Sequence, residues 1–343
     1  MTNLTKNIWL IGAAAGFATV LLFVSSGLAA GGGLLGLFVP LPSLIAGLAW
    51  GWPVAGIAGL TGAVFFFVMT SGIGGLIYAL LIAVPATLMA YVMGLWRPSG
   101  TDIRFIDGAS QPPDAAVSTK PDRIEWYPLS RVLMWLVLLA TVLAAFMTLS
   151  LGLDELKYRA TVYEIMDDMI ERRMEPMFQR QFTIEEKATL KERVALLLPA
   201  FVSSIWMLLM VLNTWLASRI ARASSMLARP APDLRMTGLA RVIVLGLGAA
   251  LLLTNLGGVP GRIAMGFVGA ALFAILLIGL AVVHEWSIGN PARFVLLAGV
   301  YIGLLLASFL VLPALLLLGL AEPWLDLRAR ARARRQTPQG PPE

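Results

Sequence analysis

Four acidic residues at helical spacing in one hydrophilic segment are the first candidates for chemistry. They are Glu164, Asp167, Asp168 and Glu171. Carboxylates on one side of a helix can hold a divalent cation. Arg172 and Arg173 follow directly, however, and would compete for the same carboxylates as ion-pair partners. We therefore interpret the row as a solvated helix face and predict no metal site.

The side chains on which most enzymes depend are scarce in this chain. There is no Cys, and the single His, His284, stands at the end of an apolar run beside Glu285. A Cys nucleophile is therefore excluded, and a zinc site made of several imidazoles cannot form. Neither a Walker A motif, nor a G-x-G-x-x-G after a strand, nor a G-x-S-x-G elbow is present. We predict that the protein is not an enzyme, has no catalytic residue and needs no cofactor.

Composition places the chain in a membrane. Of its 343 residues 58% are apolar and 13% are charged, with a mean hydropathy of +0.81. Soluble domains carry about 45–50% apolar and about 25% charged residues. Between Asn7 and Trp96 there is no Asp, Glu, Lys, Arg or His. We predict an all-α, polytopic integral membrane helical bundle with about eight to nine transmembrane segments, since each crossing needs about 20 apolar residues.

Nine apolar runs are candidates for the crossing helices. They are residues 8–30, 34–50, 53–70, 72–96, 132–153, 194–217, 242–256, 263–283 and 294–320. None contains an ionisable residue in its interior. Three runs are short and Pro313 interrupts the last, so we expect eight full crossings and one partial or broken element. Intramembrane acids, bases and His residues mark many proton-coupled pumps and membrane proteases, so these classes are disfavoured.

Charge in the connecting segments predicts the orientation. Arg-rich segments favour the cytoplasmic side, which places residues 218–241 inside. Residues 154–193 contain ten acids and eight bases and fit outside. Nine crossings would then put the Arg-rich tail outside, against the rule. The net charge of +6 indicates contact with anionic lipid at the cytoplasmic face, not with nucleic acid. We expect a multi-pass membrane protein.

These patterns divide the chain into five parts. They are a four-helix membrane unit (1–96), a cytoplasmic loop (97–130), two spans flanking an outer hairpin (131–217, with the hairpin at 154–193), C-terminal membrane helices (218–327) and a basic tail (328–343). The loop is rich in Pro and Gly and reads as irregular. We expect the tail to be disordered after about Arg335.

The outer segment predicts an amphipathic helical hairpin. Its apolar residues follow helical spacing from Val162 to Phe178, and Pro176 should end or kink this first helix. Thr183 and Glu186 form a capping box, from which a second helix could run straight into the next span. The methionine stripe either packs on the protein's own spans or on lipid, or it docks a partner membrane protein. The partner-binding candidates are Met166, Met169, Met174 and Met177.

Uncharged polar side chains inside the spans are candidate ligand groups. They are Ser203, Trp206, Asn213 and Asn255. A buried amide in lipid must find a hydrogen-bond partner. These residues therefore either pack between helices or line a site for a neutral, hydrogen-bonding ligand. Trp50 and Trp52 flank Gly51 and are either interface anchors or the cover of a pocket.

Several stretches resemble a known family. They are residues 41–56 (LPSLIAGLAWGWPVAG), 125–128 (EWYP), 312–314 (LPA) and 319–328 (GLAEPWLDLR). The resemblance is to the YybS-like family of uncharacterised bacterial multi-pass membrane proteins, a domain of unknown function. The first four spans also look like the S components of energy-coupling-factor vitamin transporters, small bundles that bind a vitamin or metal and dock on a separate ATPase module.

This resemblance implies a component of the bacterial inner membrane that binds or transports a small neutral solute. The cavity would lie among the first six helices. The alternative is a non-transporting scaffold or assembly factor, acting through the outer hairpin and the basic cytoplasmic face.

Overall fold

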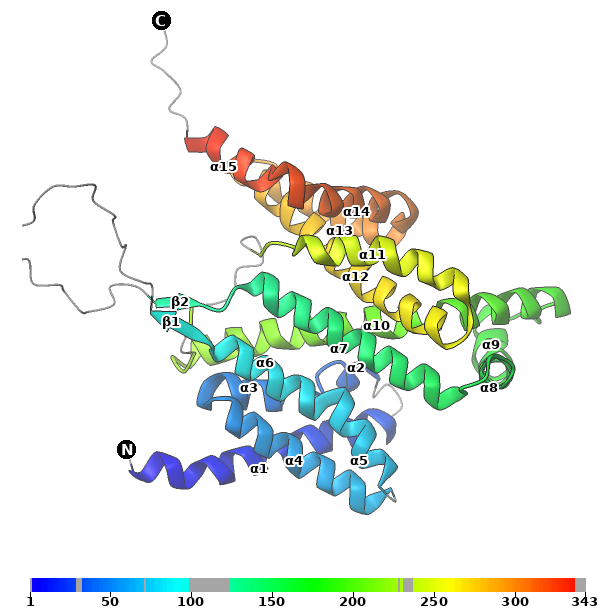
Figure 1. Cartoon of the computed structure of the whole chain (residues 1–343), viewed down its shortest axis with the longest axis horizontal. Helices are drawn as coiled ribbons and strands as arrows, with labels where there is room; N and C mark the ends of the chain where they lie inside the picture. The colour runs from blue at the N-terminus through cyan, green and yellow to red at the C-terminus, as the bar shows by residue number, and fades with distance from the viewer. Residues whose placement is uncertain are drawn as a thin grey trace, which may run out of the picture. The chain divides into compact units, whose positions relative to one another are not determined.

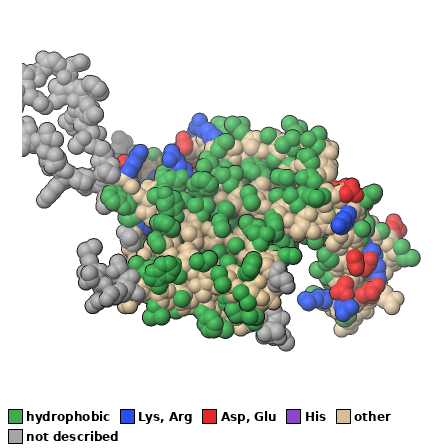
Figure 2. Space-filling view, turned by 60° about the horizontal axis from the view of Figure 1, so that its bottom comes forward, with side chains coloured by type: hydrophobic (Ala, Val, Ile, Leu, Met, Phe, Trp, Pro, Cys, Tyr) green, Lys and Arg blue, Asp and Glu red, His purple; other side chains and the backbone are tan. Residues whose placement is uncertain are grey.

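The computed structural model describes residues 2–28, 33–70, 72–98, 124–227, 229–230 and 237–336, and nearly all of them are helical (Figure 1). Eight helices in this part of the chain are long and apolar enough to cross a membrane. Large apolar side chains stay exposed, including Phe67 at 62%, Leu252 at 75% and Leu305 at 82%. Apolar side chains are spread widely over the face in Figure 2, whereas acidic and basic ones are confined to a few patches. Such a surface suits lipid, and the predicted all-α, multi-pass membrane bundle is confirmed.

The chain divides into two compact units. Unit 1 comprises Met1–Pro128 and Leu216–Ala231, and unit 2 comprises Leu129–Trp215 and Pro232–Glu343. The elements of unit 1 are α1 (Thr2–Leu28), α2 (Gly33–Gly36), α3 (Leu41–Trp50), α4 (Trp52–Met69), α5 (Ile73–Tyr78), η1 (Ala79–Ala83), α6 (Val84–Gly94), β1 (Trp96–Pro98) and β2 (Ile124–Trp126).

Unit 2 begins with α7 and also holds most of α10, whose last residues belong to unit 1. Its elements are α7 (Leu129–Leu151), α8 (Glu155–Met169), η2 (Ile170–Met174), α9 (Glu175–Phe178), α10 (Ile184–Ala223), α11 (Arg241–Leu253), η4 (Thr254–Leu256), α12 (Gly258–Trp286), α13 (Arg293–Leu306), α14 (Ser308–Leu325) and α15 (Leu327–Gln336). The boundary expected at residue 217 falls inside α10.

Unit 1 packs through aromatic rings and small residues. Phe66 of α4 stacks on Tyr78 with ring centroids 5.2 Å apart, and Phe23 meets Phe66 edge-on at 4.9 Å. A Cβ atom at Gly62 would lie 2.2 Å from the Tyr78 ring, so glycine is required for this close approach. Contacts of this kind hold helices together in lipid, where burial of apolar surface gives little driving force.

Two prolines inside helices are each preceded by a widened π turn. Pro85 is the second residue after η1, and Pro176 is the second residue after η2. Proline lacks an N–H and its ring crowds the carbonyl of the preceding turn, and a wider turn makes room for it. We expected Pro176 to end or kink its helix. The helix does not end at Pro176 but continues to Phe178, and Gln179 caps it with a left-handed φ of 52°. A kink at Pro176 stays a prediction.

The outer hairpin forms as predicted. Val162, Met166 and Ile170 are buried in a small core of their own, which also includes Tyr158 and Ala195. The capping box is present: the Thr183 N–H donates to Glu186 Oε2 at 2.8 Å, and the Glu186 N–H donates to Thr183 Oγ1 at 3.2 Å. From there α10 runs without interruption through the following span.

The last apolar run forms two helices instead of one. The break lies at Ala307, with φ −132° and ψ 43°, whereas Pro313 stays inside α14. A Cβ at Gly303 would lie 2.8 Å from Val311 Cγ2. Residues eight apart in a straight helix are separated by about 12 Å along its axis. The chain therefore turns sharply at Ala307, and α13 packs on α14.

Several helix ends of unit 2 lie close together and are joined by polar contacts. Arg328 pairs with Glu322 at 2.6 Å and donates to Thr237 O at 2.8 Å, while Arg335 pairs with Glu285. The ends of α12 and α14 and the segment before α11 thus share one side of the membrane, and α13 and α14 enter and leave on that side. The conflict over the Arg-rich tail disappears, because Arg328 contacts Thr237, which belongs to the Arg-rich segment 218–241 that the charge rule predicts to be cytoplasmic.

Two expectations for irregular segments need adjustment. Where an irregular loop was expected after residue 96, β1 and β2 pair antiparallel with Trp96 opposite Trp126. The remainder of that loop, residues 99–123, lies outside the described residues. The basic tail is helical through Gln336. The disorder expected beyond it falls on residues that are likewise not described.

Candidate ligand site

Three tryptophan side chains and one tyrosine side chain lie at one end of unit 1, where several helices begin or end. Trp50 ends α3 and Trp52 begins α4, and Gly51 between them has φ 99°. Glycine adopts this conformation at no steric cost, so the two helices can join through a single residue. Tyr91 lies near the end of α6, and the strand pair that follows places Trp126 nearby.

These segments enclose a cavity of about 500 Å³, a volume within the range of about 300–1,000 Å³ for small-molecule sites. Its wall is mainly apolar and includes the four aromatic side chains just named. Arg229, from the segment after α10, also lines it and is the one charged lining residue in the described part of the chain. From the sequence, Trp50 and Trp52 are either interface anchors or the cover of a pocket. In the structure both line the cavity.

Arg229 is held by long hydrogen bonds. Nη1 donates to Met93 O at 3.3 Å, and Nη2 donates to Tyr127 O at 3.5 Å. Typical N–H···O distances are about 2.7–3.2 Å. The guanidinium carbon lies 5.8 Å from the Trp126 ring centroid. Nε is buried without a hydrogen-bond partner among the described residues, none of whose carboxylates forms an ion pair with Arg229. This cation therefore keeps donor capacity that an anion could use.

Burial lowers the pKa of Arg229 from its ordinary value. Arginine nevertheless stays protonated in proteins, because its ordinary pKa lies far above physiological pH. A charge that has lost part of its hydration without gaining a counter-ion is costly. A bound anion would offset that cost, and the surrounding rings would cover the apolar part of the same ligand.

The ligand groups expected from the sequence occupy other places. Ser203, Trp206 and Asn213 are buried on α10 in unit 2. Ser203 Oγ donates to Ala200 O at 2.9 Å, and Asn213 Nδ2 donates to Leu209 O at 2.7 Å. These bonds within one helix give the Ser203 hydroxyl and the Asn213 amide nitrogen a local acceptor.

Asn255 is exposed in the middle of η4, and its Nδ2 donates to Leu251 O at 3.2 Å. None of these four residues lines the cavity of unit 1. Their role as ligand groups stays a prediction.

The acidic row and His284 make local contacts. Asp167 pairs with Lys191, Asp168 pairs with Arg172, and Glu171 lies 3.9 Å from Lys187. No three possible metal ligands come together in the described part of the chain. His284 Nδ1 lies 2.9 Å from Leu280 O.

The methionine stripe is divided between the core and the surface of the hairpin. Met166 is only 5% exposed and belongs to the hairpin core. Met174 is partly buried against that core. Met169 and Met177 are 43% and 77% exposed. Two of the four partner-binding candidates therefore lie on the outer surface, and their role in docking stays a prediction.

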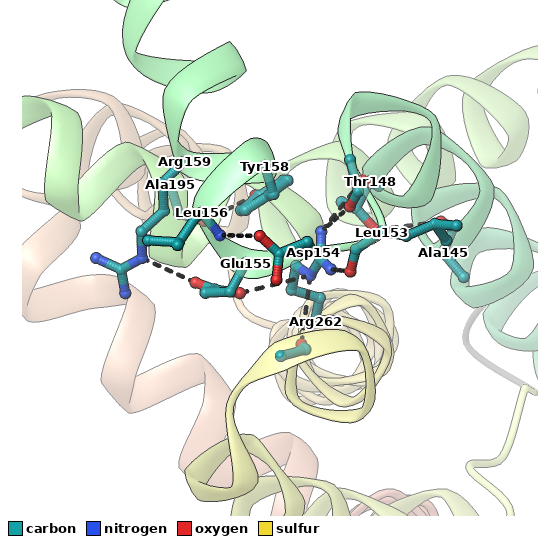
Figure 3. A network of polar contacts seen from close by, with 12 residues as sticks. Ala145, Thr148, Leu153, Asp154, Glu155, Leu156, Tyr158, Arg159, Ala195 and Arg262 are labelled. Carbon is teal, nitrogen blue, oxygen red and sulfur yellow. Dashed lines mark hydrogen bonds and ion pairs between the residues drawn. The ribbon is translucent and has the colours of Figure 1, made fainter.

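A second buried arginine, Arg262, was missed because it stands just before the run predicted to begin at residue 263. It lies in the first turns of α12 (Figure 3). Its Nη1 donates to Gly152 O at 2.7 Å and to Thr148 O at 3.4 Å, and its Nη2 donates to Leu153 O at 2.8 Å. A cation bound to carbonyls at and just beyond the end of α7 also complements the helix dipole.

Two further residues complete this network. Glu155 lies 3.8 Å from Arg262 Nε, and the Tyr158 ring centroid lies 4.4 Å from the Arg262 guanidinium carbon. Burial raises the pKa of Tyr158 to about 12, with the positive charge of Arg262 acting in the opposite direction. The phenol is therefore neutral at physiological pH, and it donates to Ala195 O at 2.8 Å. Arg262 thus ties α7, α8 and α12 together as a structural group.

Comparison of the chain with known protein families, with curated proteins and with solved structures finds no match. The resemblance to YybS-like proteins and to S components therefore stays a prediction.

Proposed function

We propose that this multi-pass membrane protein binds, and takes part in transporting, a small organic anion in the cavity of unit 1. The observation that carries the proposal is Arg229, a half-buried cation with unused donors in a largely aromatic wall. The sequence had favoured a neutral solute. An anion suits this wall better, because Arg229 has no counter-ion among the described residues.

The chemistry of the wall defines the ligand class. A guanidinium presents several N–H donors to a carboxylate or a phosphate. Tryptophan and tyrosine rings bury large apolar areas while keeping a polar edge. The ligand would therefore carry one anionic group and a flat or apolar body. A solute-binding bundle of this kind would act in the manner of an S component, with a separate module supplying energy.

Tryptophan fluorescence of the purified protein tests this function, with phenyl phosphate as the probe. We expect saturable quenching by phenyl phosphate and at least about tenfold weaker binding to Arg229→Gln, since a charge-assisted pair is lost. Arg97→Gln is the matched control: it removes the same charge from an exposed residue that pairs with Glu125. Equal affinity for phenol and phenyl phosphate, or equal affinity of wild type and Arg229→Gln, would refute the proposal.

The hairpin surface supports a second candidate function, that of a scaffold. Met177, Phe178 and Ile184 are 77%, 55% and 90% exposed near the turn of the hairpin. Exposed apolar side chains beside polar ones are typical of protein contacts. Replacing Met177 and Ile184 by Ser should release a partner that co-purifies with the wild type. Unchanged co-purification would count against this role.

A further inference from the structure

Resting on the proposed function, we propose that the natural ligand is an anionic phospholipid. Its phosphate binds Arg229, and one of its acyl chains lies in a groove of unit 1 formed by α4, η1 and α6. The inference names the chemical class of the ligand and extends the site from the cavity into the neighbouring groove.

The groove is a hollow of about 520 Å³ with an almost entirely apolar lining. Small residues make it: Gly56, Gly59 and Ala63 on α4 face Ala79 and Ala83 of η1. A Cβ at Gly56 would lie 3.7 Å from Thr87 Cγ2, an ordinary contact distance. A Cβ at Gly56 would thus fit in the hollow beside α6, whereas Gly59 is packed directly against Ala83.

The groove and the cavity share two residues. Trp52 and Tyr91 line both hollows, and their rings form an edge-to-face pair with centroids 5.9 Å apart. Both side chains are about half exposed. An amphiphile that passes this aromatic pair would place a polar group on the side of Arg229 and an apolar chain on the side of Gly56. One amphiphilic ligand would therefore fill both the cavity, which contains Arg229, and the apolar groove.

The position of the site at the ends of helices fits the depth at which phospholipid phosphates are found. The ends of α3 and α6 and the start of α4 all border the cavity, so it opens at one end of the unit 1 helices. Trp and Tyr favour the headgroup level of a bilayer. The Arg-rich loop that supplies Arg229 predicts the cytoplasmic leaflet, which carries the anionic lipids. A lipid could enter sideways from this leaflet.

The two halves of the site contribute differently. Lipid tails are as apolar as the groove, so the chain gains packing contacts but little from the hydrophobic effect. Discrimination between lipids must then come from the charge at Arg229. We therefore expect selection for anionic over zwitterionic headgroups, together with sensitivity to the shape of the groove.

Native mass spectrometry of the full chain in phosphatidylcholine nanodiscs that contain a minor fraction of phosphatidylglycerol tests the inference. Wild type should retain phosphatidylglycerol in preference to phosphatidylcholine. Arg229→Gln should abolish the preference, and Gly56→Leu, which fills the groove, should reduce retention at least about tenfold. Ala14→Leu is the matched control, because it adds the same bulk to an exposed position on α1 that lines neither hollow.

The phenyl phosphate titration separates the two proposals. If Gly56→Leu binds phenyl phosphate like the wild type but loses the lipid, both proposals stand. If Gly56→Leu and Ala14→Leu retain phosphatidylglycerol equally while Arg229→Gln still loses phenyl phosphate, the lipid inference fails and the anion site remains. Retention of both lipids in proportion to their abundance by the wild type also overturns the inference. Loss of Arg229 dependence for both ligands overturns both proposals.

Discussion

Arg229 of unit 1 and Arg262 of unit 2 are both arginines withdrawn from solvent, yet they are bonded differently. Arg262 donates to backbone carbonyls at 2.7 and 2.8 Å and has Glu155 beside it. The bonds of Arg229 measure 3.3 and 3.5 Å, and its Nε has no partner among the described residues. Arg262 lies among packed helices, whereas Arg229 faces a cavity. The difference teaches that bonding geometry, more than burial, separates an arginine that holds a fold from one available to a ligand.

The largest effect should come from removing the structural arginine. Arg262→Met leaves the carbonyls of Gly152 and Leu153 without their donor, and we expect a loss of about 3 kcal/mol in the free energy of unfolding. Thermal unfolding in detergent measures it. Arg159→Met is the control: it removes an exposed partner of the same Glu155, and we expect a loss below about 0.5 kcal/mol. Equal midpoints for the two variants would contradict the structural role of Arg262.

For a substitution at Arg229 we expect no loss in the free energy of unfolding, and any gain is the opposite of the change at Arg262. Arg229→Met replaces a poorly compensated charge with an apolar side chain of similar length. Without ligand it should leave stability unchanged or raise it by about 1 kcal/mol. Thermal unfolding of the ligand-free protein gives the sign. A loss as large as that of Arg262→Met would make Arg229 a structural residue and remove the contrast.

We expect the smallest effect on stability from acidification. It extends the comparison of the two units, because the hairpin of unit 2 depends on carboxylates. The hydrogen bond from Lys187, with that from the Phe182 N–H, lowers the pKa of Glu175 below its ordinary 4.5. The Thr183 N–H, with Arg180, lowers the pKa of Glu186 in the same way. A lowered folded-state pKa means stability that is present above 4.5 and lost as the pH falls through the folded value.

Hydrogen exchange of the hairpin measures this effect. Protection of residues 155–190 should stay constant from pH 7 to about 5 and fall below about pH 4, after correction for the intrinsic exchange rate. Unit 1 has no charged residue on its described helices between α1 and β1, so α4 serves as the internal reference. Equal losses in both regions would show general acid unfolding and not the titration of the two carboxylates.

Local patterns in the sequence predicted most of the fold. The charge-free runs indicated the spans, and the spacing of Thr183 and Glu186 predicted where α10 begins. The turn at Ala307 could not be predicted, because no proline or glycine marks it. Arg229 counted in the sequence only as one positive charge among several. Its importance comes from the cavity that it lines together with Trp52 and Tyr91, which are far away along the chain.

The π turn before Pro85 sets the rotational phase of α6. A regular helix advances by about 100° per residue, so a widened turn rotates every later side chain relative to those before it. Tyr91 lies downstream of η1 and faces Trp52 at the junction of the two hollows. A chain that lost one residue from η1 and carried Pro85→Ala would form a straighter helix with Tyr91 swung away from its partner. The π turn thus determines the direction in which Tyr91 points, although Tyr91 lies further along the same helix.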